Sequence, residues 1–151
     1  MTGFMEFTKR RNLNRGYMRR EAWQRGMDLF VMAFRLSSGV SDPKLKSQFR
    51  DAAQSVSANT AEGHGRRSLS ECLQFLCTTK GPLAETRTRA IGLQNVTFVS
   101  TGDFEDIDRL HYEAENKLLR LIESLENKRG TSEWRDKLRP TIHQSLNPSI
   151  Q

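Results

Sequence analysis

In Asn-Thr-Ala-Glu-Gly-His-Gly-Arg-Arg-Ser-Leu-Ser-Glu, residues 59–71, the signals that end one helix are followed at once by the signals that begin another. Gly63 and Gly65 can adopt the positive φ that closes a helix C-terminus. Ser68 and Glu71 are three residues apart, the spacing of a capping box, in which a hydroxyl and a carboxylate pair with free backbone N–H groups. The stretch therefore predicts a tight helical hairpin.

Two adjacent arginines, Arg66 and Arg67, lie between these signals, on the corner of the predicted hairpin. Side chains on so short a connection are held close to the ends of two helices. The pair therefore indicates an anionic partner. The alternative is that the two arginines only keep the corner solvated.

The positive charge of the chain is concentrated at its two ends. The formal net charge is +6 over 151 residues. Residues 1–20 contain six basic residues and one acidic residue, residues 127–151 contain five and two, and residues 21–126 contain 13 and 15. Basic ends on a nearly neutral body are typical of proteins that neutralise nucleic-acid phosphates. Tails that only maintain solubility are the alternative, and composition does not separate the two.

Apolar residues recur at helical spacing in four segments. We expect helices over 19–36, 43–62, 69–94 and 101–128, with Thr101 capping the last one. Pro82 lacks the N–H for a bond to Thr78, so the third helix is expected to bend without ending. The connection at 96–99 is rich in β-branched residues and is expected to be extended.

Four amphipathic helices with short joints predict an all-α, antiparallel, up-down four-helix bundle over residues 19–129. Residues 1–18 are expected to form a basic N-terminal arm, and residues 130–151 a C-terminal tail. The spacing also predicts which side chains face the core. They are Trp23, Met27, Phe30 and Phe34 in the first helix, and Phe104, Ile107, His111, Ala114, Leu118, Leu121 and Leu125 in the last.

Several ordered runs carry a family resemblance. They are Gln48-Phe49-Arg50-Asp51-Ala52-Ala53, Ser55-Val56-Ser57-Ala58-Asn59-Thr60-Ala61-Glu62-Gly63-His64-Gly65-Arg66-Arg67-Ser68 and Glu71-Cys72-Leu73-Gln74-Phe75-Leu76. These runs resemble the Arg-Arg-Ala-Ala, Asn-Ile-Ala-Glu-Gly, Gly-Arg-Arg-Ser and Glu-Phe-x-x-Phe-Leu signatures of the bacterial four-helix-bundle proteins encoded in 23S rRNA intervening sequences. The resemblance covers roughly residues 15–126.

The resemblance implies an oligomer, expected to be a homopentamer, with a nucleic-acid role. The family is also related to the accessory variability proteins of diversity-generating retroelements, which are basic pentameric bundles that bind nucleic acid and a reverse transcriptase. Asp51 departs from the pattern, because it stands where the family usually has arginine. It places an anion on the second helix and weakens the case that this face binds phosphate.

The candidate functional residues form two groups. Seven arginines are expected to contact nucleic-acid phosphates without reading sequence: Arg10, Arg11, Arg15, Arg19, Arg20, Arg66 and Arg67. Four residues are expected to form a structural polar network near the corner: Arg50, Asn59, Glu62 and Glu85. Asn59 and Glu62 are neighbours on one helix face. Glu85 is expected to meet Arg50 or Arg66, because a buried carboxylate needs a partner.

The sequence predicts no enzyme, metal site or cofactor. A di-iron bundle needs paired Glu-x-x-His motifs. The nearest match is the single Asp108-x-x-His111, whose histidine falls on the apolar face, where a hydrogen-bonded core histidine is expected. Cys72 and Cys77 are five residues apart on one helix and cannot pair with each other, so both are expected to be reduced thiols in a cytoplasmic protein. No apolar run is long enough to span a bilayer, and residues 1–20 lack the apolar region of a secretory signal.

We therefore expect a non-catalytic, nucleic-acid-binding accessory protein, with RNA as the expected partner and DNA as the alternative, acting at an rRNA intervening sequence or a retroelement. The competing expectation is an oligomeric structural or protein–protein scaffold, for example one that docks a reverse transcriptase. In that case four apolar residues would pair subunits or contact the partner: Leu29, Ala33, Phe75 and Ile122.

Overall fold

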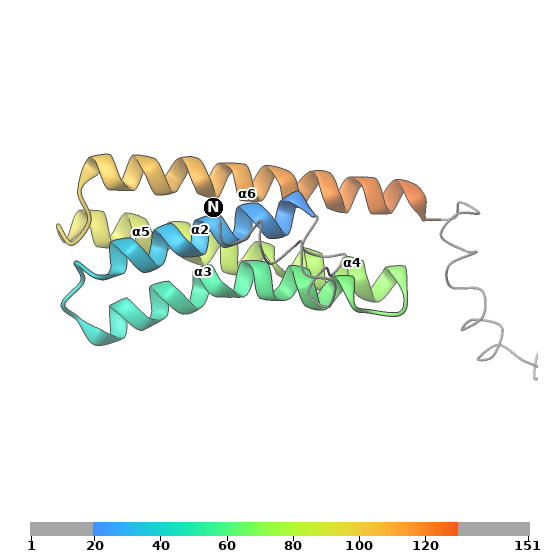
Figure 1. Cartoon of the computed structure of the whole chain (residues 1–151), viewed down its shortest axis with the longest axis horizontal. Helices are drawn as coiled ribbons and strands as arrows, with labels where there is room; N and C mark the ends of the chain where they lie inside the picture. The colour runs from blue at the N-terminus through green and yellow to red at the C-terminus, as the bar shows by residue number, and fades with distance from the viewer. Residues whose placement is uncertain (1–19, 130–151) are drawn as a thin grey trace, which may run out of the picture.

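Residues 20–129 are described by the computed structural model, and the expected arm and the expected tail lie outside them. Within this range the chain is helical and contains no strand. The helices are α2 (Glu21–Ser37), α3 (Pro43–His64), α4 (Leu69–Thr78), α5 (Lys80–Asn95) and α6 (Thr101–Lys128). Successive rods run in opposite directions, with α4 and α5 together forming the third rod (Figure 1). The predicted all-α four-helix bundle is confirmed.

Three helices begin at a side chain that accepts a bond from a free backbone N–H. The Asp42 carboxylate accepts from Leu45 N at 2.9 Å, and Pro43 occupies the first helical position of α3. Ser68 Oγ accepts from Glu71 N at 3.0 Å at the start of α4, as the capping-box spacing predicted. For α6 the cap is Ser100, whose Oγ accepts from Asp103 N at 3.1 Å. The assignment of Thr101 as that cap was wrong by one residue.

The corner between α3 and α4 is built differently from the prediction. Gly65 has a φ of −80°, and Gly63 lies inside α3, so neither adopts the expected positive φ. Gly63 instead permits a close approach of two helices. A Cβ at this position would lie 3.0 Å from Phe75 Cβ and 3.3 Å from Cys72 O. Gly26 has the same role between α2 and α3, where a Cβ would lie 3.1 Å from Val56 Cγ1.

The third rod is interrupted at Thr79, just before the proline that was expected to kink it. Thr79 alone separates α4 from α5, and its φ of −64° and ψ of −20° remain in the right-handed helical region. Thr79 N donates to Phe75 O and Leu83 N donates to Thr79 O, both at 3.2 Å. Hydrogen bonding therefore continues across the break, although Pro82 supplies no N–H. The segment expected to be one bent helix is thus two helices, α4 and α5, which Thr79 joins into one rod.

A tight turn follows α5, where an extended connection was expected. Phe98 N donates to Leu93 O at 2.9 Å and Thr97 N donates to Gln94 O at 3.0 Å, which is the bonding pattern of a Schellman motif. Thr97 occupies the left-handed position of this motif with a φ of 67°. The β-branched residues suggested extended backbone, but the free carbonyls at the end of α5 are satisfied by reversing the chain.

The face that α2 turns to the core differs from the predicted stripe. The buried residues of this helix are Ala22, Gly26, Leu29, Ala33 and Ser37. Trp23, Met27 and Phe30 are half-buried, and Phe34 is 51% exposed. Small side chains face inward because α2 packs closely on α3 at Gly26. The large apolar residues are consequently displaced to the flank of the helix.

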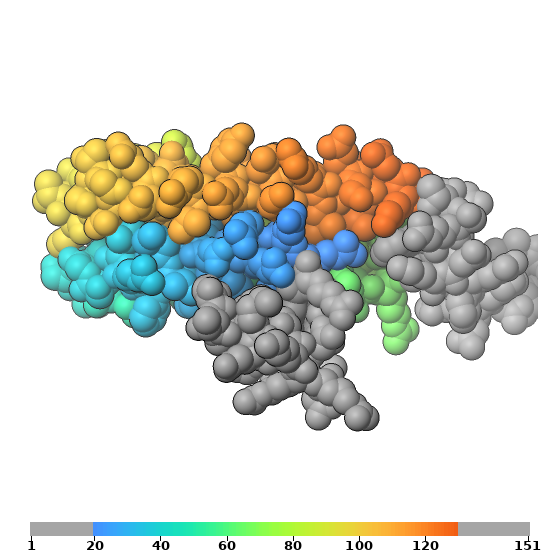
Figure 2. Space-filling view, turned by 45° about the horizontal axis from the view of Figure 1, so that its top comes forward, coloured from blue at the N-terminus to red at the C-terminus, as the bar shows by residue number. Residues whose placement is uncertain are grey.

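The last helix follows its predicted pattern more closely. Ile107, His111, Ala114, Leu118 and Leu125 are buried as expected. Phe104 and Leu121 are half-buried, whereas Ile122, which was expected outside the core, is buried. In Figure 2 the side chains of α6 and α2 adjoin along one face of the molecule.

Candidate nucleic-acid interface

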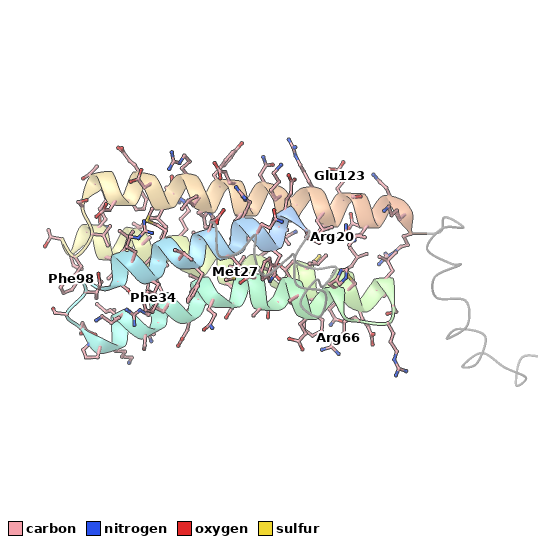
Figure 3. All side chains as sticks on the ribbon, viewed as in Figure 1. Arg20, Met27, Phe34, Arg66, Phe98 and Glu123 are labelled. Atoms are coloured by element: carbon pink, nitrogen blue, oxygen red, sulfur yellow. The ribbon has the colours of Figure 1, made fainter. Side chains whose placement is uncertain are left out.

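The predicted phosphate-binding arginines within the described residues gather at one end of the bundle. Arg20 immediately precedes α2, and Arg66 and Arg67 lie in the connection between α3 and α4. Arg20 and Arg66 line the same cavity. Figure 3 shows both toward the end where α3 meets α4, away from Phe34 and Phe98. The other four expected contacts, at residues 10, 11, 15 and 19, lie outside the described range.

Arg66 is fixed by two neighbours. Its Nη2 donates to Glu62 Oε1 at 2.8 Å, and its guanidinium carbon lies 4.2 Å from the centroid of the Phe75 ring. The side chain is nevertheless 38% exposed. Because a guanidinium has five N–H groups, the bond to Glu62 leaves donors for an external anion. The corner therefore presents a cation whose orientation is set before binding.

Arg67 and Arg20 differ in how their charge is compensated. Arg67 is exposed, and no carboxylate within residues 20–129 lies within ion-pair distance of it. The carboxylate beside Arg20 is Glu21, which pairs with Lys117 at 3.0 Å. The hydrogen bond from Lys117 lowers the pKa of Glu21. Glu21, the acidic residue nearest to Arg20 in the sequence, is thus paired with α6.

The four residues of the expected polar network belong to separate contacts. Glu62 pairs with Arg66 at the corner. Glu85 pairs with Arg89 on its own helix, with an Oε1 to Nη2 distance of 2.8 Å. The expectation that Glu85 meets Arg50 or Arg66 was therefore wrong. An i, i+4 partner was already available on α5 and required no contact between helices. Asn59 lies half-buried on α3.

Arg50 stabilises the opposite end of the α2–α3 pair. Its Nε donates to Ser37 Oγ at 2.5 Å, and its guanidinium carbon lies 4.0 Å from the centroid of the Phe34 ring. Ser37 Oγ in turn donates to Phe34 O at 2.7 Å. These contacts join the end of α2 to α3. The role of Arg50 is accordingly structural, while its neighbour Asp51 is exposed to solvent.

The sequence model of the 23S rRNA-intervening sequence proteins matches residues 18–120. The chain belongs to the 23S rRNA-intervening sequence protein family. The family takes its name from intervening sequences of 23S rRNA. A search of curated proteins finds no match. The matched range contains the arginines at positions 19, 20, 66 and 67 but not those at 10, 11 and 15.

Other candidate chemistry in this family member has a structural explanation. His111 is 6% exposed and its Nε2 lies 2.8 Å from Leu83 O, which confirms the expected hydrogen-bonded core histidine. Within residues 20–129, no three potential metal ligands come together. None of the helices in that range combines the length and the apolar character that crossing a bilayer requires.

The two cysteines of this 23S rRNA-intervening sequence protein have different surroundings. Cys72 is buried and Cys77 is exposed, and both are free thiols. Burial raises the pKa of Cys72, although the nearby positive charge of Arg20 acts in the opposite direction. Cys72 also lines the cavity shared by Arg20 and Arg66. Sequence reasoning did not find this cavity, because its walls come from segments that lie far apart along the chain.

Proposed function

We propose that this protein is a non-catalytic RNA-binding accessory protein that contacts phosphates through the arginines at one end of its bundle. The observation that carries the proposal is the position of Arg20, Arg66 and Arg67 at one end of the bundle, where Arg66 contacts Glu62 and Phe75. Membership of the 23S rRNA-intervening sequence family supports RNA over DNA as the partner. Contacts to phosphates position a protein without reading sequence.

Salt dependence provides the first test. The apparent binding constant for a single-stranded or hairpin RNA should fall steeply with salt, since the logarithmic slope is about −0.7 for each phosphate neutralised on a single strand. Fluorescence anisotropy titrations at several salt concentrations between about 50 and 200 mM measure this slope. An affinity that does not change with salt would contradict the proposal.

Charge removal at the corner provides the second test. Arg67→Ala should weaken RNA binding about fivefold, the effect of losing roughly 1 kcal/mol of attraction between exposed charges. Arg67 is the cleanest choice, because no ion pair or ring contact with a described residue is lost with it. The matched control is Arg109→Ala on α6, which removes an exposed arginine away from the corner. Equal effects of the two substitutions would argue against a localised interface.

A second candidate function is an oligomeric scaffold, and the flank of α2 favours it. The large apolar residues on this flank are Phe34, which is 51% exposed, and Val31, which is 36% exposed, next to half-buried Phe30. Three residues previously expected to pair subunits cannot do so, because Leu29, Ala33 and Ile122 are buried in the core. Phe75 is half-buried under Arg66.

Sedimentation velocity tests the scaffold directly. We expect an assembly, with a pentamer as the specific hypothesis, and we expect Phe34→Ser to shift it toward the monomer. The control is Leu45→Ser on α3, which replaces an apolar residue of 37% exposure. Docking of a reverse transcriptase would be a further use of the same assembly. A wild-type protein that sediments as a monomer at micromolar concentration would exclude the scaffold.

A further inference from the structure

The cavity at the corner end of the bundle has an apolar floor. It encloses about 180 Å³ and lies among the start of α2, the end of α3, α4 and the end of α6. Leu76, Leu121 and Leu125 contribute its aliphatic surface. Cys72 adds a thiol that remains protonated at neutral pH, because burial raises its pKa. A ligand that reached this floor would exchange water for hydrocarbon contacts.

Three of the other residues that line the cavity are cationic or able to become cationic. Arg20, His64 and Arg66 also line the cavity, and Arg66 and His64 are exposed to solvent. No carboxylate occurs among the described residues that line it. An apolar floor beneath positively charged side chains favours a ligand that combines an uncharged ring or chain with an anionic group.

The volume restricts the apolar part of that ligand. An apolar protein cavity of about 150 Å³ is large enough to bind benzene. The present cavity is slightly larger, so it has room for one six-membered ring. Among the parts of RNA, a pyrimidine base has one ring of this kind. Proteins that recognise RNA commonly take up bases that are splayed out of loops and bulges.

One buried side chain can recognise the polar edge of such a ring. Thr60 lines the cavity and is 2% exposed. Its Oγ1 donates to Val56 O at 2.8 Å, so its own hydrogen is used within α3. The lone pairs of this oxygen remain able to accept a hydrogen bond. Uracil and cytosine both carry an N–H group that could donate to it.

We propose that this cavity binds one unpaired pyrimidine of RNA, with the base inside and the flanking phosphates on Arg20 and Arg66. The inference rests on the proposed function, because it requires that RNA reaches the corner. It adds a recognition mode that phosphate contacts alone do not give. Binding should depend on the presence of an unpaired base and on its size.

Changes in the RNA test the proposal without changing the protein. Four hairpins of equal length would carry a single bulged uridine, a bulged adenosine, a bulged abasic nucleotide or no bulge. In anisotropy titrations we expect the uridine bulge to bind about tenfold more tightly than the other three, because its base exchanges water for hydrocarbon contacts on the apolar floor. Equal affinities for the uridine and abasic bulges would overturn the proposal.

Filling the cavity tests it from the protein side. Leu121→Phe should reduce the affinity for the uridine bulge to that of the paired hairpin, while the affinity for the paired hairpin stays the same. The matched control is Leu119→Phe, an identical substitution on α6 at an exposed position outside the cavity lining. Retention of the uridine preference by a folded Leu121→Phe variant would show that the cavity is only a packing defect, and so would overturn the proposal.

A second variant covers the case in which Leu121→Phe does not fold. Thr60→Val removes the acceptor at similar volume, and it should weaken binding of the uridine bulge about fivefold without affecting the abasic bulge, since a neutral hydrogen bond contributes about 1 kcal/mol. Equal effects on both RNAs would count against the base-binding mode. Failure of the wild-type protein to bind any of the four hairpins would instead refute the proposed function itself.

Discussion

His111 Nε2 on α6 donates a hydrogen bond to Leu83 O on α5 across a distance of 2.8 Å. Because a carbonyl oxygen can only accept, this contact places the proton on Nε2. Leu83 follows Pro82, so the bond joins α6 to the first turn of α5. The bond therefore holds the start of α5 against the neighbouring helix.

Replacement of His111 by alanine should destabilise the protein. The substitution removes both the bond to Leu83 O and the buried imidazole, and we expect a loss of about 2–3 kcal/mol in the free energy of unfolding. Urea denaturation followed by circular dichroism measures it. Tyr112→Ala is the control, because Tyr112 is 67% exposed and its loss should change stability by less than about 0.5 kcal/mol.

Two glycine substitutions should have opposite effects. Gly63→Ala places a methyl group 3.0 Å from Phe75 Cβ and should cost about 1–3 kcal/mol through overpacking. Gly92→Ala introduces a methyl group with nothing within 4 Å, inside α5, and should stabilise by about 0.5–1 kcal/mol through the better helix propensity of alanine. Thermal unfolding of both variants checks this. A similar change in Tm for both would contradict the packing role of Gly63.

Thr97→Gly should stabilise the protein. The left-handed φ of 67° costs a β-branched residue about 1–2 kcal/mol, and glycine adopts this conformation without strain. Part of the gain is offset by the greater entropy of glycine in the unfolded chain, so we expect a net increase of about 0.5–1 kcal/mol. Thr88→Gly, in the exposed middle of α5, should destabilise instead. A destabilised Thr97→Gly variant would mean that the turn depends on the threonine side chain.

The stability of the protein should fall in alkaline solution partly because of Cys72. Burial raises the pKa of this thiol above its ordinary value of 9.0, so the folded state retains a proton that the unfolded state releases. The contribution of the Cys72 thiol to the free energy of unfolding is complete below pH 9.0 and is lost as the pH rises through the pKa of the folded state. We expect Cys72→Val to lose less stability than wild type between neutral pH and alkaline pH in urea denaturation. Parallel pH profiles of the two proteins would contradict this prediction.

The helix boundaries could be predicted from local chemistry, whereas the inner face of α2 could not. Asp42 with Pro43 and Ser68 with Glu71 are strong start signals, because they satisfy backbone N–H groups within three residues. The stripe from Trp23 to Phe34 has core-like spacing, but spacing alone does not decide between a large face and a small one. Close packing of Gly26 on α3 decides which face of α2 is buried. This contact is made with Val56, a residue thirty positions away in the sequence.

The candidate site could be predicted only where neighbouring residues in the sequence define it. Arg66 and Arg67 could be assigned to a corner because the termination and start signals flank them directly. Glu85 could not be assigned correctly, since its choice of Arg89 depends on competition between a partner on its own helix and partners elsewhere. The cavity had no local signal, because Thr60, Cys72 and Leu121 meet only after all four rods have packed.

The up-down arrangement also determines where the chain leaves the bundle. Arg20 lines the same cavity as Leu125, only a few residues before α6 ends at Lys128, and Arg66 lines it too. Residues 1–19 and 130–151 are thus tethered to the end that carries the corner arginines. In the proposed function, the basic residues that precede α2, those of the corner and those that follow α6 are therefore all joined to the same end of the bundle.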